Sequence, residues 1–324
     1  MSESSMSDVE RLRPKLLAVA YRMLGTVTDA ENAVQDAYLR YHKFTTGPHA
    51  AVEAPEGWLV RTTTRLCIDR LRTAKREEYV GQWLPEPVPE SWGGATTDRA
   101  ELAESLSTAF LVLLETLSPA ERATHILREV FGYEFDEIAG LLDITPVNAR
   151  QIAARARKRI GTRERRFDPP PGAADDLAAR FFAACQAGDV TAIESMLAAD
   201  VTLMSDGGGK AFAAKQPVVG VRKVANLLAV VFRKLRAVGA AELTTVNGGP
   251  GVVFTVAGRP VEVITLAADG GHVNRLYVIL NPDKLHRWPK SSAGSGDGSD
   301  RPGPWERTNN GTATELHETD PRTA

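Results

Sequence analysis

The sequence predicts a multidomain protein in which two all-α modules precede a cone-shaped α+β domain and a disordered tail. Helical periodicity with few glycines runs through residues 9–78 and again through 99–166. After a proline-rich break, residues 173–287 combine helices with four or five β-rich runs, a pattern typical of helices packed on a curved, mostly antiparallel sheet. Residues 288–324 hold too few aliphatic side chains to build a core, so we expect them to be disordered.

The composition of the whole chain is globular and argues against several classes of function. Its 324 residues are 43% hydrophobic and 25% charged, with a net charge of −2. Two cysteines without CxxC spacing and six scattered histidines predict neither a disulfide framework nor a metal site, and no motif indicates a cofactor. No apolar run approaches the ~20 residues that span a bilayer, and no signal peptide begins the chain, so we expect a cytoplasmic protein without a membrane partner.

The first helical module, residues 9–78, contains two helices with clear buried faces. Residues 29–43 form the first helix, whose inward positions are Ala30, Val34, Ala37 and Tyr41. Residues 58–76 form the second helix, whose inward positions are Leu59, Thr62, Leu66 and Cys67. The stretch between them, 44–55, holds two prolines and a glycine and is predicted to be a loop.

Basic side chains gather on the second of these helices, where Asp69 is the only acid. They are Arg61, Arg65, Arg70, Arg72, Lys75 and Arg76. Taken alone, such a helix could be an ordinary cationic surface, but a second basic helix in the same chain favours DNA binding. The neighbouring loop suits capture of an unstacked base better than reading of intact duplex.

The second helical module, residues 99–166, carries a helix-turn-helix. Ser118 to Glu121 form a capping box with proline at the first helical position, so a helix begins there. Residues 136–142 form a short helix, and Asp143 takes the tight-turn position that requires a left-handed backbone. Thr145 then caps a second helix over 146–160.

The outward residues of this last helix predict a DNA-binding surface. Val147, Asn148, Arg150 and Gln151 lie at its N-terminal end, the end that enters a major groove. Farther along, the basic residues of the stripe are Arg155, Arg157, Lys158, Arg159, Arg163, Arg165 and Arg166. The alternative is a surface hairpin with a solvated charge run. Since Glu164 is the single acid among these residues, a phosphate-binding surface is the better interpretation.

Three short motifs lie outside the helical modules. WLPEP, in the linker 79–98, is extended by its prolines and offers Trp83 and Leu84 as apolar anchors for a neighbouring domain. DGGGK follows a strand, and its glycines permit either close approach of another chain or a flexible turn. NPDKL follows the last strand and by itself reads as a strand terminator. Motifs on three separate segments fit one shared interface.

The two helical modules together resemble a known family. DAENAVQDAYLR and the Trp58–Arg72 motif resemble region 2 of bacterial sigma factors, and LSPAER, DEIA and RARKR resemble region 4. A linker of some twenty residues replaces region 3, as in the extracytoplasmic-function group. Asn32 and Arg65 depart from the residues typical of that group, which are Asp and Asn. The resemblance implies a sigma factor whose partners are core RNA polymerase and promoter DNA.

The resemblance also implies a role for each surface. Core polymerase would be contacted by Asp29, Gln35, Asp36 and Arg40. The minus-10 element would be bound by Arg61, Arg65, Arg70, Arg72, Lys75 and Arg76. The minus-35 element would be bound by Val147, Asn148, Arg150, Gln151, Arg155, Arg157, Lys158 and Arg159.

The three short motifs together resemble the subgroup with a fused SnoaL-like domain of the nuclear-transport-factor-2-like superfamily, which regulates the sigma factor in cis. The implied regulatory residues are Trp83, Leu84, Pro85, Glu86, Pro87, Asp206, Gly207, Gly208, Gly209, Lys210, Asn281, Pro282, Asp283, Lys284 and Leu285. These motifs leave open whether the cone binds a small ligand.

Two alternatives remain. One is a free-standing helix-turn-helix regulator with a ligand-sensing domain, and the other is an enzyme with a DNA-binding appendage. The polar candidates for catalysis are Asp206, Asp269, His272 and Asn274. No nucleophile and base can be paired from the sequence, so we expect no enzyme.

Overall fold

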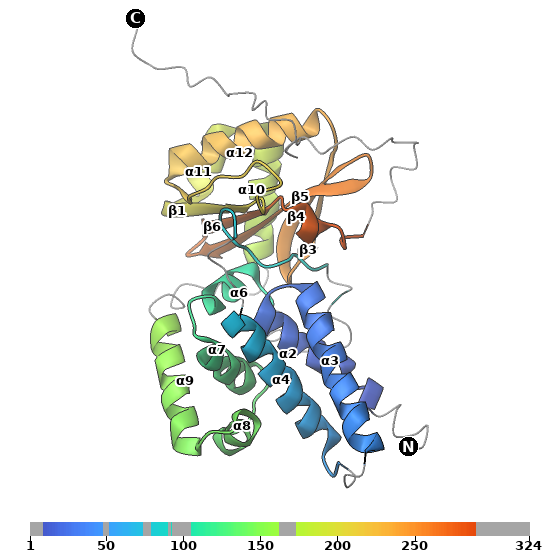
Figure 1. The fold of residues 1–324 in the computed structure, drawn as a ribbon. Coiled ribbons are helices and arrows are strands. Elements are labelled where there is room, and N and C mark those ends of the chain that lie inside the picture. Colours follow the sequence, from blue (N-terminus) through green and yellow to red (C-terminus); the bar gives the residue numbers. More distant parts are fainter. Residues whose placement is uncertain are drawn as a thin grey trace, which may run out of the picture.

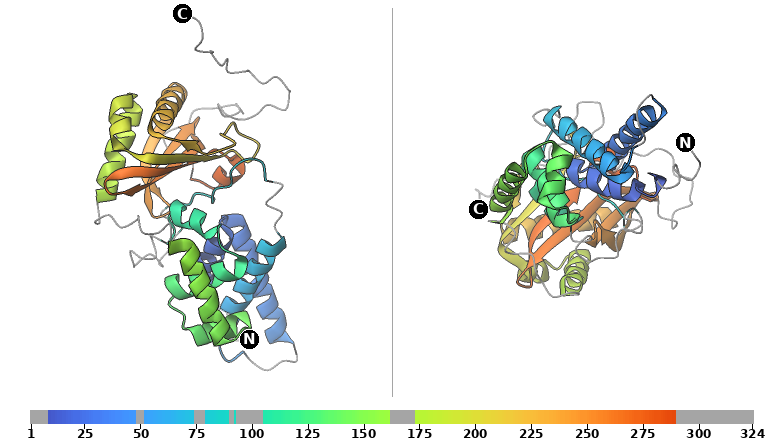
Figure 2. Two further views of the ribbon diagram at one scale, coloured as in Figure 1. Left: turned by 90° about the vertical axis from the view of Figure 1, so that its left-hand side faces the viewer. Right: turned by 90° about the horizontal axis from the view of Figure 1, so that it is seen from below.

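The computed structural model describes residues 9–47, 52–73, 79–89, 92, 105–161 and 173–289 (Figure 1). Within these residues, two helical units lie on one side and an α+β unit on the other, and the extended segment 79–89 runs between the two sides (Figures 1 and 2). The predicted tail beyond residue 289, the break at 167–172 and the basic residues after 161 fall outside the described residues.

The first helical unit consists of α2 (Arg13–Leu24), α3 (Val27–Thr46) and α4 (Pro55–Thr73). Both predicted helices are confirmed, with different ends. Helix α3 extends into the stretch predicted to be a loop. Helix α4 begins earlier than predicted, at Pro55, because proline suits the first turn of a helix.

The buried face of α4 differs from the prediction at one position. Leu59, Leu66 and Cys67 are buried as expected. Thr62 is half-buried, and its hydroxyl donates to the backbone carbonyl of residue 58. Thr63 and Thr64 are buried instead, because α4 is covered on two sides rather than one.

The second helical unit contains the predicted helix-turn-helix. Its elements are α6 (Thr108–Leu114), α7 (Pro119–His125), the π-helical turn η3 (Ile126–Val130), α8 (Phe135–Leu142) and α9 (Pro146–Gly161). The capping box at Ser118 is formed in both directions. Asp143 ends α8 with a φ of 62°, and the Thr145 hydroxyl accepts from the Asn148 amide. The sequence therefore predicted the turn and both caps correctly.

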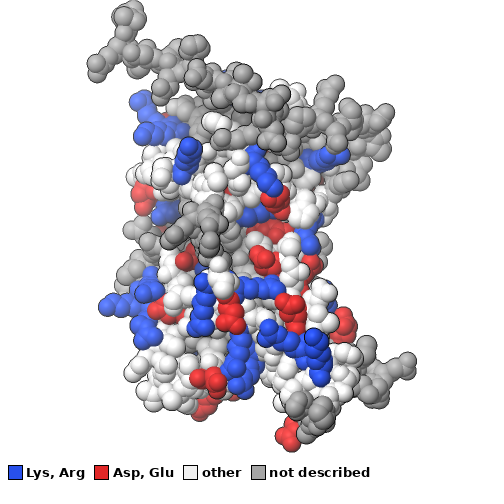
Figure 3. Space-filling model, viewed as in Figure 1, with Lys and Arg blue, Asp and Glu red and all other residues white. Residues whose placement is uncertain are grey.

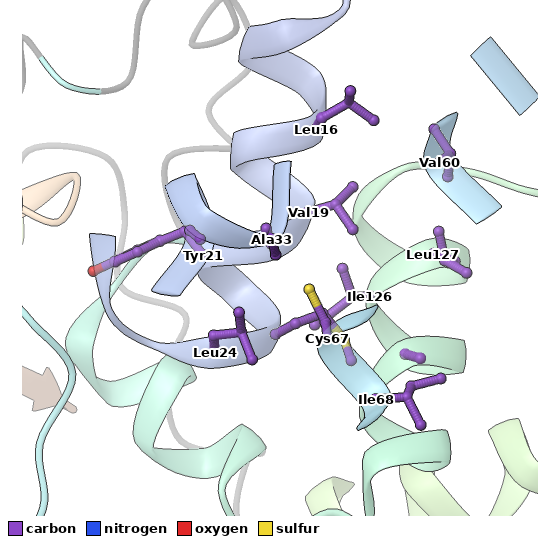
Figure 4. Packing of buried hydrophobic residues seen from close by; sticks show 14 of the residues in the cluster. Leu16, Val19, Tyr21, Leu24, Ala33, Val60, Cys67, Ile68, Ile126 and Leu127 are labelled. Carbon is purple, nitrogen blue, oxygen red and sulfur yellow. The ribbon is translucent and has the colours of Figure 1, made fainter. Parts of the chain in front are cut away.

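The two helical units share one hydrophobic core. In Figure 4, Val19 of α2 and Cys67 of α4 lie beside Ile126 and Leu127 of the second unit. All four side chains are almost fully buried. The Arg122 guanidinium strengthens this contact, since Nη1 donates to the backbone carbonyl of residue 23, 2.8 Å away, at the end of α2.

The third unit is an α+β domain built on a six-stranded sheet in the order β2-β1-β6-β5-β4-β3. The strands are β1 (Leu197–Asp206), β2 (Val218–Val219), β3 (Ala240–Val246), β4 (Gly249–Val256), β5 (Arg259–Asp269) and β6 (His272–Ile279). The helices are α10 (Ala173–Ala187), α11 (Val190–Met196), α12 (Val221–Arg236) and α13 (Pro282–Leu285). All neighbouring strands are antiparallel except β1 and β6. The predicted α+β class is confirmed.

The two faces of the sheet have different neighbours. Helices α10, α11 and α12 cover one face and enclose the larger core (Figures 1 and 2). The other face carries a smaller cluster that includes Leu84 of the linker and Leu285 of α13, with Val112 of α6 packed against it. Trp288 also packs on this cluster, so the ordered domain continues past the predicted boundary at residue 287. This second face lies toward the helical units.

Candidate functional site

Helix α9 presents its predicted base-reading residues to solvent. Val147 is 61% exposed, Arg150 and Gln151 are exposed, and Asn148 is half-buried. Ala149 and Ile152 face the core, as predicted. The N-terminal end of α9 therefore has the geometry of a groove-entering helix.

The basic stripe on α9 is more neutralised than the sequence indicated. Acids from other elements of the second unit lie against it. The ion pairs are Arg150–Asp136 at 3.8 Å, Arg155–Glu121 at 3.6 Å, Arg159–Glu121 at 2.6 Å and Arg157–Glu129 at 3.2 Å. The one-sign stripe was predicted from neighbours in the chain, and folding places α7, η3 and α8 beside it. Figure 3 shows acidic and basic side chains interspersed over the helical half. Lys158 is exposed and forms no ion pair among the described residues.

The basic side chains of α4 are also paired within the protein. Arg61 and Arg65 lie 3.7 and 3.4 Å from the Asp143 carboxylate in the turn of the helix-turn-helix. Arg70 donates to Asp36 at 2.8 Å and to the backbone carbonyl of residue 29 at 2.6 Å. Arg72 lies 3.7 Å from Asp69. Asp69 is the only acid within the predicted helix 58–76, and folding brings two acids of other elements, Asp36 and Asp143, beside its arginines. Lys75 and Arg76 are outside the described residues.

The face of α3 predicted to contact polymerase is largely free. Asp29, Gln35 and Arg40 are exposed, and Asp36 is half-buried beside Arg70. Sequence reasoning missed Leu39, which is 52% exposed on the same face, four residues after Gln35. A single exposed leucine is common on protein surfaces, so Leu39 marks a position on this face and does not by itself define a binding site.

The segment Leu84–Val88 is held by an alternating pattern of hydrogen bonds. Each of its three amide N–H groups has a partner in another part of the fold. The donor–acceptor pairs are Leu84 N to Asp206 Oδ2 at 2.9 Å, Glu86 N to Gly25 O at 2.8 Å and Val88 N to Asn247 Oδ1 at 3.1 Å. The intervening prolines have no N–H to satisfy. The proline alternation therefore matches the contacts of the docked segment.

Asp206 and Lys284 form the centre of the contact between the linker and the α+β domain. The side chains are 0% and 6% exposed, and Nζ lies 2.7 Å from Oδ2. Lys284 Nζ also donates to the Leu84 carbonyl and lies 4.4 Å from the centroid of the Trp83 ring. Tyr79 donates its hydroxyl to Asp206 Oδ1 at 2.6 Å. A buried, fully partnered ion pair thus clamps the linker between the second and third motifs.

The glycines of DGGGK permit this close approach. Gly208 and Gly209 have φ values of 56° and 75°. A Cβ on Gly208 would lie 2.3 Å from the Asn281 side chain, and one on Gly209 would lie 3.0 Å from Val80 of the linker. The tight-approach reading of this motif therefore describes the structure, and the flexible-turn reading does not.

A second set of contacts joins the linker to the first helical unit, and no motif in the sequence predicted it. Glu86 accepts a hydrogen bond from the Val27 amide at 2.8 Å, at the start of α3. Burial raises the pKa of Glu86 above its ordinary value. Tyr21 donates to the Glu86 carbonyl and accepts from Asn247 Nδ2, both at 2.7 Å. Asn247 has a φ of 53° in the β3–β4 turn. We refer to both sets of contacts together as the linker clamp, formed by residues 79–89, Tyr21, Gly25, Val27, Asp206–Lys210, Asn247 and Asn281–Lys284.

The four polar residues considered for catalysis do not form one cluster. Asp269 and His272 are cross-strand partners at the β5–β6 turn. Asp206 is paired with Ile279 at the other end of β6, about 23 Å from His272 at ~3.3 Å per residue. Asp206 is committed to Lys284, and His272 is exposed. The sequence missed Glu262, which is 1% exposed; burial raises its pKa to about 8.

Two further observations concern metal binding and membrane-spanning helices. No cluster of three or more His, Cys, Asp or Glu residues within the described ranges could hold a metal ion. Among the helices that the structure describes, none is both long enough and apolar enough to cross a bilayer.

These features define a helix-turn-helix DNA-binding protein with a second basic helix and a fused α+β domain. Residues 9–77 match the family Sigma-70 region 2, and residues 107–160 match Sigma-70, region 4. The chain is 36% identical over 295 residues to the ECF RNA polymerase sigma factor SigJ of Mycobacterium tuberculosis, covering 86% of this chain and 93% of that protein. It is 28% identical over 278 residues to a probable ECF sigma factor, SigI, of the same species, covering 84% and 92%.

The crystal structure of the Mycobacterium tuberculosis sigma factor SigJ is similar over nearly the whole fold. The TM-score is 0.69 at 34% identity, covering 87% of this chain and 98% of that one. This chain therefore belongs to the extracytoplasmic-function (ECF) RNA polymerase sigma factors, as its motifs predicted. Sigma factors act with RNA polymerase at promoter DNA. The first helical unit is accordingly region 2, and the second is region 4.

Proposed function

We propose that this sigma factor engages its partners through three surfaces. The α3 face with Gln35, Leu39 and Arg40 binds core polymerase. The basic face of α4 binds the minus-10 element, and the N-terminal end of α9 reads the minus-35 element. The exposure of the α3 and α9 residues, and the positions of all three surfaces on the matched regions, support the assignment. Residues 9–78, 99–166 and 173–287 are the proposed working units, joined by the linker 79–98.

We further propose that the α+β domain controls activity in cis through the linker clamp. The observation that carries this proposal is the buried Asp206–Lys284 pair, which holds the described part of the linker between regions 2 and 4 against the third domain. The linker cannot straighten or shift while Leu84 is buried and its amide is bonded to Asp206. The clamp therefore adds a second restraint on the relative placement of the two DNA-binding regions, beside the hydrophobic core that they share.

The regulation works by packing and not by imitation of DNA. Basic residues slightly outnumber acidic ones in residues 173–287, so the domain is not an acidic DNA mimic. Its contacts are with the linker, with Val112 of region 4, and with region 2, where Arg287 lies 2.7 Å from Glu31 of α3. Opening the clamp removes the restraint that the α+β domain places on regions 2 and 4, so that only their shared core opposes the separation that the promoter requires.

Transcription in vitro with purified core polymerase tests this function. The full chain should direct open-complex formation with polymerase and show little specific promoter binding without it. Tight, specific operator binding by the isolated chain at physiological salt would favour the free-standing regulator. Asp206→Asn keeps an acceptor for the Leu84 amide and leaves Lys284 buried without its counter-charge, so it should open the clamp and raise transcription.

The control for this experiment is Asp269→Asn. Asp269 carries the same charge in the same domain and makes no contact with the linker in the described residues. Equal transcription from the Asp206→Asn variant and this control would contradict regulation through the clamp. We propose no catalytic role for the α+β domain, because Asp206 is committed to Lys284 in the clamp, while Asp269 and the exposed His272 lie at a surface turn at the other end of the sheet. Turnover of a substrate by this domain would overturn that view. Binding of a small ligand in the cone is a separate proposal.

A further inference from the structure

The turn of the helix-turn-helix lies against the basic face of α4. Arg61 Nη2 lies 3.7 Å from Asp143 Oδ1, and Arg65 Nη2 lies 3.4 Å from Asp143 Oδ2. The Nη2 atom of Arg65 is buried and makes no hydrogen bond among the described residues, so Asp143 supplies its counter-charge. One carboxylate of region 4 thus pairs with two arginines of region 2.

The end of helix α8 strengthens this negative site. Asp143 is the C-cap of α8, and its left-handed backbone places its own N–H on the Ala139 carbonyl, one of the last carbonyls of the helix. The Leu141 carbonyl accepts from Arg65 Nε at 3.3 Å. The C-terminal end of a helix carries a partial negative charge. Carboxylate and carbonyl oxygens together offer an arginine the same kind of acceptors that a phosphate offers.

We propose that Asp143 is an internal competitor for DNA, which occupies Arg61 and Arg65 of α4 while regions 2 and 4 are packed together. The inference rests on the proposed role of α4 in binding the minus-10 strand. A guanidinium that is paired with Asp143 must release it before it contacts a phosphate. Binding of the DNA strand and packing of region 4 on α4 are therefore mutually exclusive at these two arginines.

Each partner of this contact stands where another residue would be expected. The resemblance to the ECF group implies asparagine at the position of Arg65. Asp143 occupies a turn position that glycine would fill with less backbone strain, at a φ of 62°. The acid at this position therefore supplies a charge that the turn itself does not require.

The test is the affinity of the full chain, without polymerase, for a fluorescein-labelled single-stranded DNA of about 20 nucleotides. Asp143→Asn keeps the size and the tolerance for a left-handed backbone while removing the charge. Because the ion pairs are exposed, the expected gain in affinity is about three- to tenfold at low salt, and it should vanish as salt screens the pairs. Asp143→Gly should give the same gain with at least equal thermal stability.

Asp176→Asn is the matched control. Asp176 is an exposed acid in the first turn of α10, outside the proposed DNA-binding helices, and it forms no ion pair among the described residues. An equal gain from this control would show a general charge effect and overturn the proposal. An unchanged affinity in Asp143→Asn would overturn it as well.

A double-substitution cycle separates this inference from the proposed function. If Arg65→Gln and Arg61→Gln weaken DNA binding and the gain from Asp143→Asn disappears in their presence, the competition is supported. If both arginine variants weaken binding and the Asp143→Asn gain persists, the competition is refuted while the role of α4 stands. If neither arginine variant changes DNA binding, the role of α4 itself fails, and the competition with it.

Discussion

Removal of the Leu84 side chain should open the linker clamp without unfolding any domain. Leu84 is 0% exposed and lies in the cluster between the sheet and the helical units, beside Val263, Ile279 and Leu285. The substitution Leu84→Ala deletes apolar surface that is buried only when the linker is docked. The cores of the three units do not contain this side chain, so their own stability should stay nearly the same.

The expected magnitude follows from the burial of this one side chain. Burying a leucine fully is worth about 1.5–3 kcal/mol, and an unfilled cavity adds to the loss. A loss of about 2–3 kcal/mol in docking free energy raises the undocked population roughly 30- to 150-fold, at 1.4 kcal/mol per factor of ten. This assumes that the undocked linker exposes residue 84 completely.

Amide hydrogen exchange measures that population directly. The N–H groups of residues 84, 86 and 88 are bonded to Asp206, Gly25 and Asn247 only in the docked state. Their exchange should accelerate roughly 30- to 150-fold in Leu84→Ala, in proportion to the undocked population. Amides in the middle of β5 and α3 should keep their wild-type rates, because those elements stay folded.

Val80→Ala is the control, since Val80 is an aliphatic residue of the same linker that is 60% exposed. Its exchange rates should stay within a few-fold of wild type. Unchanged exchange at residues 84–88 in Leu84→Ala would refute the view that this side chain holds the clamp. Acceleration throughout the α+β domain would instead show that Leu84 stabilises the domain itself.

Three further predictions address other parts of the molecule. Asn247→Gly keeps the left-handed turn and removes the side chain that accepts from the Val88 amide. Amide exchange should therefore accelerate at residue 88 and much less at residue 84. Equal acceleration at both residues would mean that the two ends of the linker act as one unit. Arg150→Ala should cost about 1–3 kcal/mol of binding free energy at a single minus-35 base pair and relax specificity there. Lys158→Ala should instead weaken binding to all promoters alike. Identical losses from the two variants in transcription assays with promoter variants would contradict these roles. Burial raises the pKa of Glu262 to about 8 from 4.5, so between these pH values the unfolded chain releases a proton that the folded domain keeps. The free energy of unfolding should therefore fall by up to about 4 kcal/mol as pH rises through this range. Urea unfolding at pH 5 and pH 8 measures the difference, and Glu262→Gln should abolish it.

One short segment of the clamp contacts both the start of α3 and the sheet of the α+β domain. Glu86 caps the start of α3, the helix that carries the proposed polymerase face, and Leu84 is buried on the sheet two residues earlier. Undocking the linker therefore removes a cap from α3 at the same time as it releases the α+β domain. Loss of such a cap typically costs about 0.5–2 kcal/mol of helix stability.

The sequence determined the elements whose signals are local. A capping box at Ser118, a left-handed turn at Asp143 and a capped proline start at Pro146 fixed the helix-turn-helix, because each depends on residues within one turn of helix. The strands of the α+β domain and the docking of WLPEP were equally predictable. Prolines fix the linker as extended, and an apolar Trp-Leu pair in an extended segment needs a surface to cover it.

The tertiary structure alone decided which charges meet. Arg61 and Arg65 face Asp143 across more than seventy residues of sequence, and Glu121 faces Arg155 and Arg159 of the recognition helix. The clamp's contact with Tyr21 and Asn247 likewise joins residues from different units. Periodicity reports which face of an element is buried, but not which other element covers it. Ion pairs and hydrogen bonds between distant segments depend on that second choice, so they became visible only in the folded chain.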